Sequence, residues 1–205
     1  MNLVYKILYG VGFTPWEQMP ELPVAEQISA MFEREESGRQ PPYGSALDLG
    51  CGTGIWSVNL AARGGWEVAG VDMVPKALRG ARERAREAAV DVRFIEGDVT
   101  ALRAAHVGSG FRLVLDFSCF HGLNEAQRKA VGQEVSAVAA ADATLLILAW
   151  MPGRRGPLQP RGVGREDIEE AFPGWMVRED TAADLSGAPG SVTKAEPRWY
   201  RLRRA

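Results

Sequence analysis

Residues Leu47–Gly54 read LDLGCGTG, and this stretch predicts a short buried strand, a glycine-rich turn and the start of a helix at Ile55–Arg63. Leucine alternates with Asp48 in the strand, and glycine takes every second position of the turn. Glycine has no Cβ, so it adopts positive φ angles and lets a ligand lie close to the backbone. We therefore expect an extended cofactor to cross this turn.

Acidic residues end the next two predicted strands. The strand Glu67–Val71 ends at Asp72, and the strand Val92–Ile95 runs into a loop that contains Asp98. A carboxylate at the end of the second strand accepts hydrogen bonds from both ribose hydroxyls and disfavours a 2'-phosphate. A second acid suits the amino group of adenine. The pattern predicts a nucleoside-bearing cofactor without that phosphate.

The spacing of the glycines distinguishes between two candidate cofactors of this kind, NAD and S-adenosylmethionine (SAM). A dinucleotide fingerprint reads GxGxxG, whereas Gly50, Gly52 and Gly54 alternate here. Four motifs, in order and over roughly two thirds of the chain, make the sequence resemble the class I SAM-dependent methyltransferases. They are LDLGCGTG at 47–54, VAGVDMV at 68–74, VRFIEGDV at 92–99 and LVLDFSCFHGL at 113–123.

The resemblance implies a role for each motif position. Residues of the glycine turn would hold the methionine part of SAM, Asp72 the ribose and Asp98 the adenine amino group, while Met73 and Val99 would enclose the adenine ring. The complete set of cofactor-binding residues predicted in this way is Asp48, Gly50, Cys51, Gly52, Asp72, Met73, Asp98, Val99, Asp116, Phe117 and Trp16.

Composition limits the class of protein. The 205 residues are 46% hydrophobic, which predicts one domain: an N-terminal helical segment (1–44), a SAM-binding core (45–150) and an acceptor loop with the last strands (151–205). A net charge of −2 without a basic patch disfavours nucleic acid and favours a small-molecule acceptor. Two cysteines, a polar start and the lack of a long apolar run predict a cytoplasmic protein without a membrane span.

Strands alternate with helices along the chain, and several strands are almost continuously apolar. This pattern indicates an α/β fold with a doubly wound, mostly parallel, Rossmann-like sheet. The resemblance implies seven strands, with the last one antiparallel between its neighbours. Further helices are predicted at Val24–Glu36, Pro75–Ala89, Glu125–Ala141 and Arg165–Phe172, and further strands at Phe111–Leu115, Ala143–Trp150, Trp175–Arg178 and Arg198–Arg203.

The acceptor site is predicted less directly. The resemblance suggests that the N-terminal segment forms a lid, although its aromatic residues could equally pack on the sheet. The loop that begins Asp116-Phe117-Ser118 lacks the NPPY sequence of amino methyltransferases. It looks more like the DxG segment of thiopurine, halide and thiol methyltransferases, with serine in place of glycine. The predicted acceptor-binding residues are Phe13, Phe120, His121, Trp150 and Arg154.

Two of these residues, and the two cysteines, have alternative interpretations. His121 is a candidate general base near neutral pH, or it caps the following helix or forms a hydrogen bond with the backbone. Arg154 would bind an anionic acceptor, or it is only solvated. Cys51 and Cys119 would form a redox-sensitive pair beside SAM, or they lie there by chance. No metal site is predicted.

These patterns favour a SAM-dependent methyltransferase acting on an O, S or N atom of a small aromatic or apolar molecule. An alternative is a SAM-binding domain without catalysis, which serves as a sensor or as the partner of another methyltransferase. An NAD-linked oxidoreductase would need a hydride-transfer site, for which the sequence gives no sign.

Overall fold

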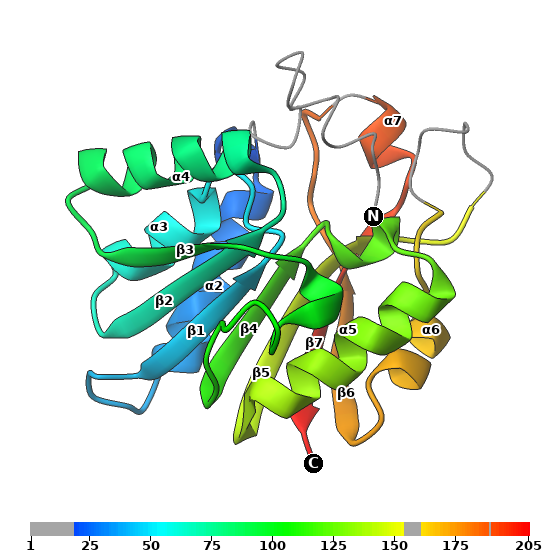
Figure 1. Ribbon diagram of the computed structural model, residues 1–205. Coiled ribbons are helices and arrows are strands. Elements are labelled where there is room, and N and C mark those ends of the chain that lie inside the picture. Colours follow the sequence, from blue (N-terminus) through cyan, green and yellow to red (C-terminus); the bar gives the residue numbers. More distant parts are fainter. Residues whose placement is uncertain (1–18, 154–160, 189) are drawn as a thin grey trace.

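The computed structural model describes residues 19–153, 161–188 and 190–205, and these build one seven-stranded sheet (Figure 1). Its strand order is β3-β2-β1-β4-β5-β7-β6, and only β7 runs antiparallel to its neighbours β5 and β6. The predicted fold class is therefore confirmed. The strands are β1 (Gly44–Leu49), β2 (Trp66–Asp72), β3 (Val92–Glu96), β4 (Phe111–Phe117), β5 (Ala139–Trp150), β6 (Trp175–Ala182) and β7 (Pro197–Arg204).

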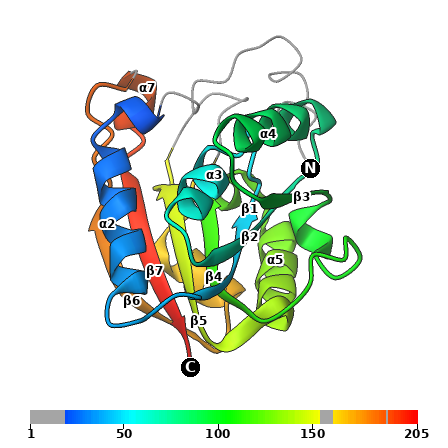
Figure 2. The ribbon, with the colours of Figure 1, turned by 90° about the vertical axis from the view of Figure 1, so that its left-hand side faces the viewer.

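Helices cover both faces of the sheet (Figure 2). Helices α2, α3 and α4 pack on one face, and α5 and α6 pack on the other. The helices are α2 (Val24–Glu36), α3 (Ile55–Ala62), α4 (Pro75–Glu87), α5 (Glu125–Val138), α6 (Arg165–Ala171) and the short α7 (Gly190–Thr193).

A hydrophobic core lies on each face of the sheet, because successive side chains of a strand point to alternate faces. In β1, Leu47 and Leu49 face the core under α5, whereas Ala46 faces the core under α2 and α3. Because successive strand residues point to opposite faces, a strand buried on both faces must be almost continuously apolar. Asp48 is the exception in β1, and a carboxylate in such a strand needs a specific reason.

Several boundaries differ from the sequence prediction by one to four residues, and the differences are largest at the start of β5 and the end of β6, which were predicted at Ala143 and Arg178. The helix predicted to reach Ala141 ends at Val138, and Ala139 already has extended backbone angles and pairs with Phe111 of β4. Alanine favours helices, but the ladder of hydrogen bonds to β4 outweighs that preference. The predicted insertion of the last strand between its neighbours is confirmed.

Several predicted positions lie outside the described residues. They are Phe13 and Trp16 in the N-terminal segment and Arg154 in the loop after β5. In the part of the chain that the structure describes, no helix is both long and apolar enough to cross a membrane.

Candidate functional site

The glycine turn connects β1 to α3 at the carboxyl edge of the sheet. Gly50 and Gly52 have φ angles of 64° and 53°, and the turn is fixed by a hydrogen bond from the Cys51 N–H to the Val71 carbonyl (3.0 Å). A Cβ added at Gly50 would lie 2.9 Å from both Cβ and Sγ of Cys119, in the loop after β4. Glycine is thus required here by backbone conformation and by close packing.

Asp72 ends β2 and organises the turn. One carboxylate oxygen accepts the Gly52 N–H at 2.9 Å and the other accepts the Val74 N–H at 2.8 Å. Burial raises the pKa of Asp72, and these two N–H groups oppose that rise because they stabilise the ionised form. The predicted ribose-binding acid is therefore in direct contact with the predicted methionine-binding turn.

Asp48 lies in β1 directly below the turn and is only 3% exposed. The Ser57 hydroxyl of α3 donates a 2.6 Å hydrogen bond to Oδ2. The pKa of Asp48 is raised to about 7, mainly by burial and to a smaller extent by the negative charge of Asp72, while hydrogen bonding to Ser57 opposes the rise. The sequence analysis gave Ser57 no role. Its position one helical turn after Gly54 is the signal that places it over the strand.

Asp116 lies in the adjacent strand β4, one position beyond Leu115, the register partner of Asp48, and is 2% exposed. Its Oδ1 accepts the N–H groups of Cys119 (3.0 Å) and Phe120 (2.9 Å), which folds the loop back over the strand end. Burial raises the pKa of Asp116 to about 7, opposed by these two bonds. Ser118 has a φ of 81°, a left-handed conformation in which glycine is favoured. Ser118 therefore holds a backbone conformation that glycine adopts more readily, and the resemblance of this loop to a DxG segment stays a prediction.

The third acidic strand end is less buried. Oδ1 of Asp98 accepts hydrogen bonds from the backbone N–H and hydroxyl of Thr100, at 2.9 and 2.7 Å, and Oδ2 accepts none from the described residues. Val99 is buried in the core on the α5 face, and Met73 packs against Val74 and Ala77. The structure thus leaves one Asp98 oxygen for a ligand donor, and enclosure of adenine by Met73 and Val99 stays a prediction.

The chemistry of these groups fits SAM. Asp48, Asp72 and Asp116 lie at the ends of three adjacent strands and form no ion pair with any described residue. Uncompensated buried carboxylates are costly, and a ligand that brings positive charge offsets that cost. SAM has an ammonium group and a sulfonium. No group of three His, Cys, Asp or Glu side chains among the described residues is arranged to hold a metal ion.

His121 and Trp150 form a stacked pair beside the β4 loop. Their ring centroids are 5.0 Å apart with an interplanar angle of 19°, and Nδ1 of His121 accepts the Trp150 N–H at 3.3 Å. A ring that accepts at Nδ1 carries its proton on Nε2 when neutral. In this arrangement His121 supports the end of β5, and a role as proton acceptor requires the other tautomer and loss of this bond.

Phe117 belongs to an aromatic cluster on the opposite face of the sheet. Its ring is 6.4 Å from Phe32, 5.9 Å from Trp56 and 5.2 Å from Trp199, between centroids, with edge-on contacts to the two tryptophans. Trp56 is buried, and its Nε1 has no hydrogen-bond partner among the residues that the structure describes. The sequence analysis did not connect these four residues, because they come from α2, α3, β4 and β7 and only the fold brings them together.

Phe120 lies away from this aromatic cluster. It is fully buried under α5 and α6, 5.4 Å from the Phe172 ring and 5.9 Å from the Arg128 guanidinium, between ring centroid and Cζ for the latter. Its observed contacts are therefore core packing, and contact with an acceptor stays a prediction. Cys51 and Cys119 are free thiols whose pKa values burial raises well above the usual range. Raised pKa values lower thiolate content, which favours the interpretation that the pair is inert.

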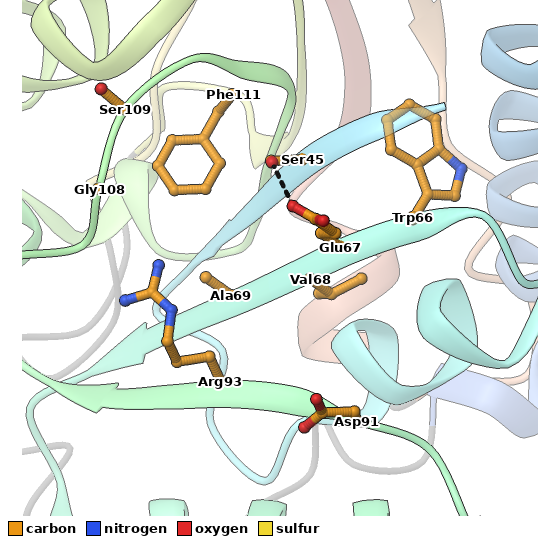
Figure 3. Close-up of a pocket in the computed structure, with 10 residues that line it drawn as sticks. All are labelled: Ser45, Trp66, Glu67, Val68, Ala69, Asp91, Arg93, Gly108, Ser109 and Phe111. Atoms are coloured by element: carbon orange, nitrogen blue, oxygen red, sulfur yellow. Dashed lines mark hydrogen bonds between the residues drawn. The ribbon is translucent and has the colours of Figure 1, made fainter. Parts of the chain in front are cut away.

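A separate cavity of about 390 Å³ lies at the amino ends of the strands (Figure 3). The Ser45 hydroxyl donates a 3.1 Å hydrogen bond to Glu67 across β1 and β2, and Asp91 and Arg93 line the side formed by β3. This groove is at the opposite edge of the sheet from the glycine turn, so it is not part of the predicted cofactor site.

Comparison with known proteins finds methyltransferases among the similar sequences. Residues 46–142 match the family described as Methyltransferase domain. The chain is 34% identical over 118 residues to a demethylmenaquinone methyltransferase of Thermus thermophilus, covering 54% of this chain and 49% of that protein. It is 35% identical over 94 residues to a ubiquinone biosynthesis O-methyltransferase of Cereibacter sphaeroides, covering 45% and 37%. The chain thus matches about half or less of the length of these curated relatives.

Solved structures share the fold over the whole chain. A 1,6-didemethyltoxoflavin-N1-methyltransferase of Burkholderia thailandensis, solved with bound 1,6-didemethyltoxoflavin and S-adenosylhomocysteine, has a TM-score of 0.75 at 18% identity over 98% of this chain and 88% of that one. A magnesium protoporphyrin IX methyltransferase of Synechocystis, solved with S-adenosylhomocysteine, has a TM-score of 0.73 at 16% identity over 99% of each chain. At these identities the likeness concerns the fold alone.

Proposed function

We propose that this chain, which belongs to the class I SAM-dependent methyltransferases, transfers a methyl group from SAM to an O, S or N atom of a small aromatic or apolar molecule. The observation that carries the proposal is the joined site at the carboxyl edge. There the glycine turn is hydrogen-bonded to Asp72, and Asp48 and Asp116 lie buried on the two adjacent central strands.

Bound SAM supplies a methyl group on a sulfonium, and the acceptor lone pair displaces the sulfur in line. The chain contributes alignment and exclusion of water. Asp72 and Asp98 hold the nucleoside, and the glycines let the cofactor lie against the backbone. The turned loop after β4, fixed by Asp116, faces the transferred group.

The aromatic residues favour a flat or apolar acceptor. Phe117 is half-buried and makes edge-on contacts with Trp56 and Trp199, so an acceptor on its exposed side would meet ring surface. A hydroxyl acceptor must also lose its proton. His121 is the proposed proton acceptor for such a substrate, at the expense of its hydrogen bond with the Trp150 N–H.

Calorimetric titration with SAM, S-adenosylhomocysteine and NAD tests the cofactor. We expect both adenosyl ligands to bind and NAD not to bind. Asp72→Ala should weaken SAM binding by roughly 100-fold, because it removes the ribose acceptor and frees the Gly52 and Val74 N–H groups that Asp72 holds. Glu67→Ala, at the other end of the same strand, is the matched control and should bind as the wild type does. Binding of NAD alone would contradict the proposal.

Methyl transfer is then measured with labelled SAM and a panel of phenols, thiols and heterocyclic amines. Transfer to any of these small acceptors identifies the acceptor atom. SAM binding without transfer to any of them would favour the non-catalytic SAM-binding domain instead.

A further inference from the structure

The indole N–H of Trp56 differs from other buried indole groups of the protein. Trp56 is 7% exposed, and its Nε1 has no hydrogen-bond partner in the part of the chain that the structure describes. Three other buried tryptophans each donate a hydrogen bond from Nε1 to a side-chain oxygen. These pairs are Trp66 with Glu36 (3.1 Å), Trp175 with Ser136 (2.9 Å) and Trp199 with Gln27 (3.0 Å). Among its described residues the chain thus supplies an acceptor for these three indoles and none for Trp56.

An unpaired N–H is unfavourable in this environment. Nε1 of Trp56 is shielded from water, so the group loses its hydration without gaining a partner. Its neighbours in the aromatic cluster are rings, and a ring face is a much weaker hydrogen-bond acceptor than an oxygen or a nitrogen. An indole N–H only donates, so the missing partner is a lone pair. A polar atom of a ligand would supply it.

Trp56 lies beside both parts of the proposed reaction site. It is the second residue of α3, directly after the glycine turn, and the next residue, Ser57, binds Asp48 below that turn. The Trp56 ring also makes an edge-on contact with Phe117, which follows Asp116 at the end of β4 (5.9 Å between centroids). A ligand atom bound to the Trp56 N–H is therefore close to both the cofactor turn and the β4 loop.

We propose that the Trp56 N–H binds the methyl acceptor, by donating a hydrogen bond to an oxygen or a ring nitrogen of a flat molecule. This inference rests on the proposed function and narrows its substrate class. A hydrogen bond to the attacking lone pair weakens as that lone pair forms the new bond, so it would oppose catalysis. The acceptor therefore has two heteroatoms, one that receives the methyl group and one that binds Trp56.

Binding at this N–H requires one neighbouring ring to move. Phe32 and Trp199 are 0% and 2% exposed and belong to the core on the α2 face. Phe117 is half-buried, and the next residue, Ser118, is left-handed with a φ of 81°. Phe117 is therefore the ring of the cluster that has solvent beside it, and the acceptor reaches Trp56 by displacing it.

The test compares flat probes of one size and shape. Quinoline and isoquinoline carry a ring nitrogen at two different positions, whereas naphthalene carries none. Binding to the protein saturated with S-adenosylhomocysteine is followed by NMR of the tryptophan indole N–H signals. The wild type should bind the better nitrogen probe about tenfold more tightly than naphthalene, because only that probe forms the hydrogen bond. The Trp56 signal should move downfield with this probe and not with naphthalene.

Two variants show which indole is responsible. Trp56→Phe removes the N–H and keeps an aromatic ring, so it should lower the ratio of the two affinities about tenfold, to near one. Loss of one indole signal in this variant also identifies Trp56. Trp66→Phe is the matched control, because it removes another buried indole N–H, bonded to Glu36 at the start of β2. It should keep the wild-type ratio.

Methyl transfer from labelled SAM extends the comparison to catalysis. A hydroxyquinoline and the naphthol with its hydroxyl at the same position differ only by the ring nitrogen. The best hydroxyquinoline should have a KM about tenfold lower than its naphthol at similar kcat, and Trp56→Phe should remove the difference. Equal KM values in the wild type would overturn the inference.

The outcomes separate this inference from the proposed function. If SAM binds but neither nitrogen probe binds more tightly than naphthalene, or Trp56→Phe keeps the wild-type ratio, the role of Trp56 is wrong and the methyltransferase proposal stands. If the wild type binds neither adenosyl ligand, both proposals fail. Should Trp56→Phe not fold, the wild-type ratio and the downfield shift of an indole signal decide, and a ratio of one would overturn the inference.

Discussion

The two edges of the parallel sheet carry similar residues in opposite environments. At the carboxyl edge Asp48 and Asp116 are buried, and their partners are a hydroxyl and backbone N–H groups. At the amino edge Glu67 and Asp91 line an open groove and are exposed to water. Water stabilises an unpaired carboxylate, whereas a protein interior does not. An acidic residue near a strand end is therefore not enough to indicate a binding site. A carboxylate that is buried without a neighbouring cation is a stronger indication.

Left-handed backbone occurs at both edges. The carboxyl edge has left-handed residues at Gly50, Gly52 and Gly54 and also at Ser118, which is a strained conformation for a residue with a side chain. At the amino edge, Gly64 has open space where a Cβ would be, whereas a Cβ at Gly65 would lie 2.9 Å from Pro41 and Tyr43. Positive φ and close packing of glycine therefore do not separate the two edges, and the buried acids do.

The largest change in the free energy of unfolding should come from removing the buried charge of Asp116. Burial raises the pKa of Asp116 to about 7 in the folded protein, above its ordinary 3.8, so folding favours the protonated form. Stability from this group is therefore highest at low pH and is lost as the pH rises to 7. Asp116→Asn should raise the free energy of unfolding of the ligand-free protein by roughly 2–4 kcal/mol at pH 8 and change it little near pH 4.

Urea denaturation at both pH values measures this change. Glu67→Gln, at the amino edge, is the control and should be neutral at both. An Asp116→Asn variant that is less stable than wild type at pH 8 would show that its carboxylate has a compensating partner in the free protein, and the contrast between the two edges would fail.

A smaller effect is expected from packing. In Gly50→Ala the new methyl group would meet Cys119 at 2.9 Å in addition to the left-handed strain, so we expect a loss of about 2–3 kcal/mol and weaker SAM binding. Gly64→Ala has the strain alone, because nothing lies within 4 Å, and should cost about 1 kcal/mol. Thermal denaturation of the two variants compares them directly. Equal losses would mean that close packing at the turn contributes nothing.

The smallest effect should come from the groove at the amino edge. Arg93 donates hydrogen bonds to the carbonyls of His106 and Val107 and so holds the loop before β4. Because the side chain is exposed, Arg93→Ala should cost about 1 kcal/mol or less. Calorimetry should give the wild-type affinity for SAM. A clear loss of SAM binding would show that the two edges are coupled and would end the distinction between them.

Local pattern was enough to predict most of the elements. The helix α2 begins and ends at the predicted residues, and the glycine turn, the acid after β2 and the order of strands and helices agree with the prediction. These features follow from residue spacing and from the special backbone freedom of glycine, which act over a few residues. The prediction that the alanines at the end of α5 are helical was wrong. Ala139 pairs with Phe111 of β4, which lies 28 positions earlier in the chain, and this pairing determines its conformation.

The roles within the site depend on contacts between distant segments. The sequence by itself was enough to predict the glycine turn and the acids Asp72 and Asp98, because each lies at a strand end that the local pattern identifies. These residues in turn indicated the class of cofactor. Only the tertiary structure decided the burial of Asp116, the pairing of His121 with the Trp150 N–H and the assembly of aromatic rings around Phe117. Burial and partner choice depend on which strands and helices become neighbours, and single-sequence spacing does not contain that information.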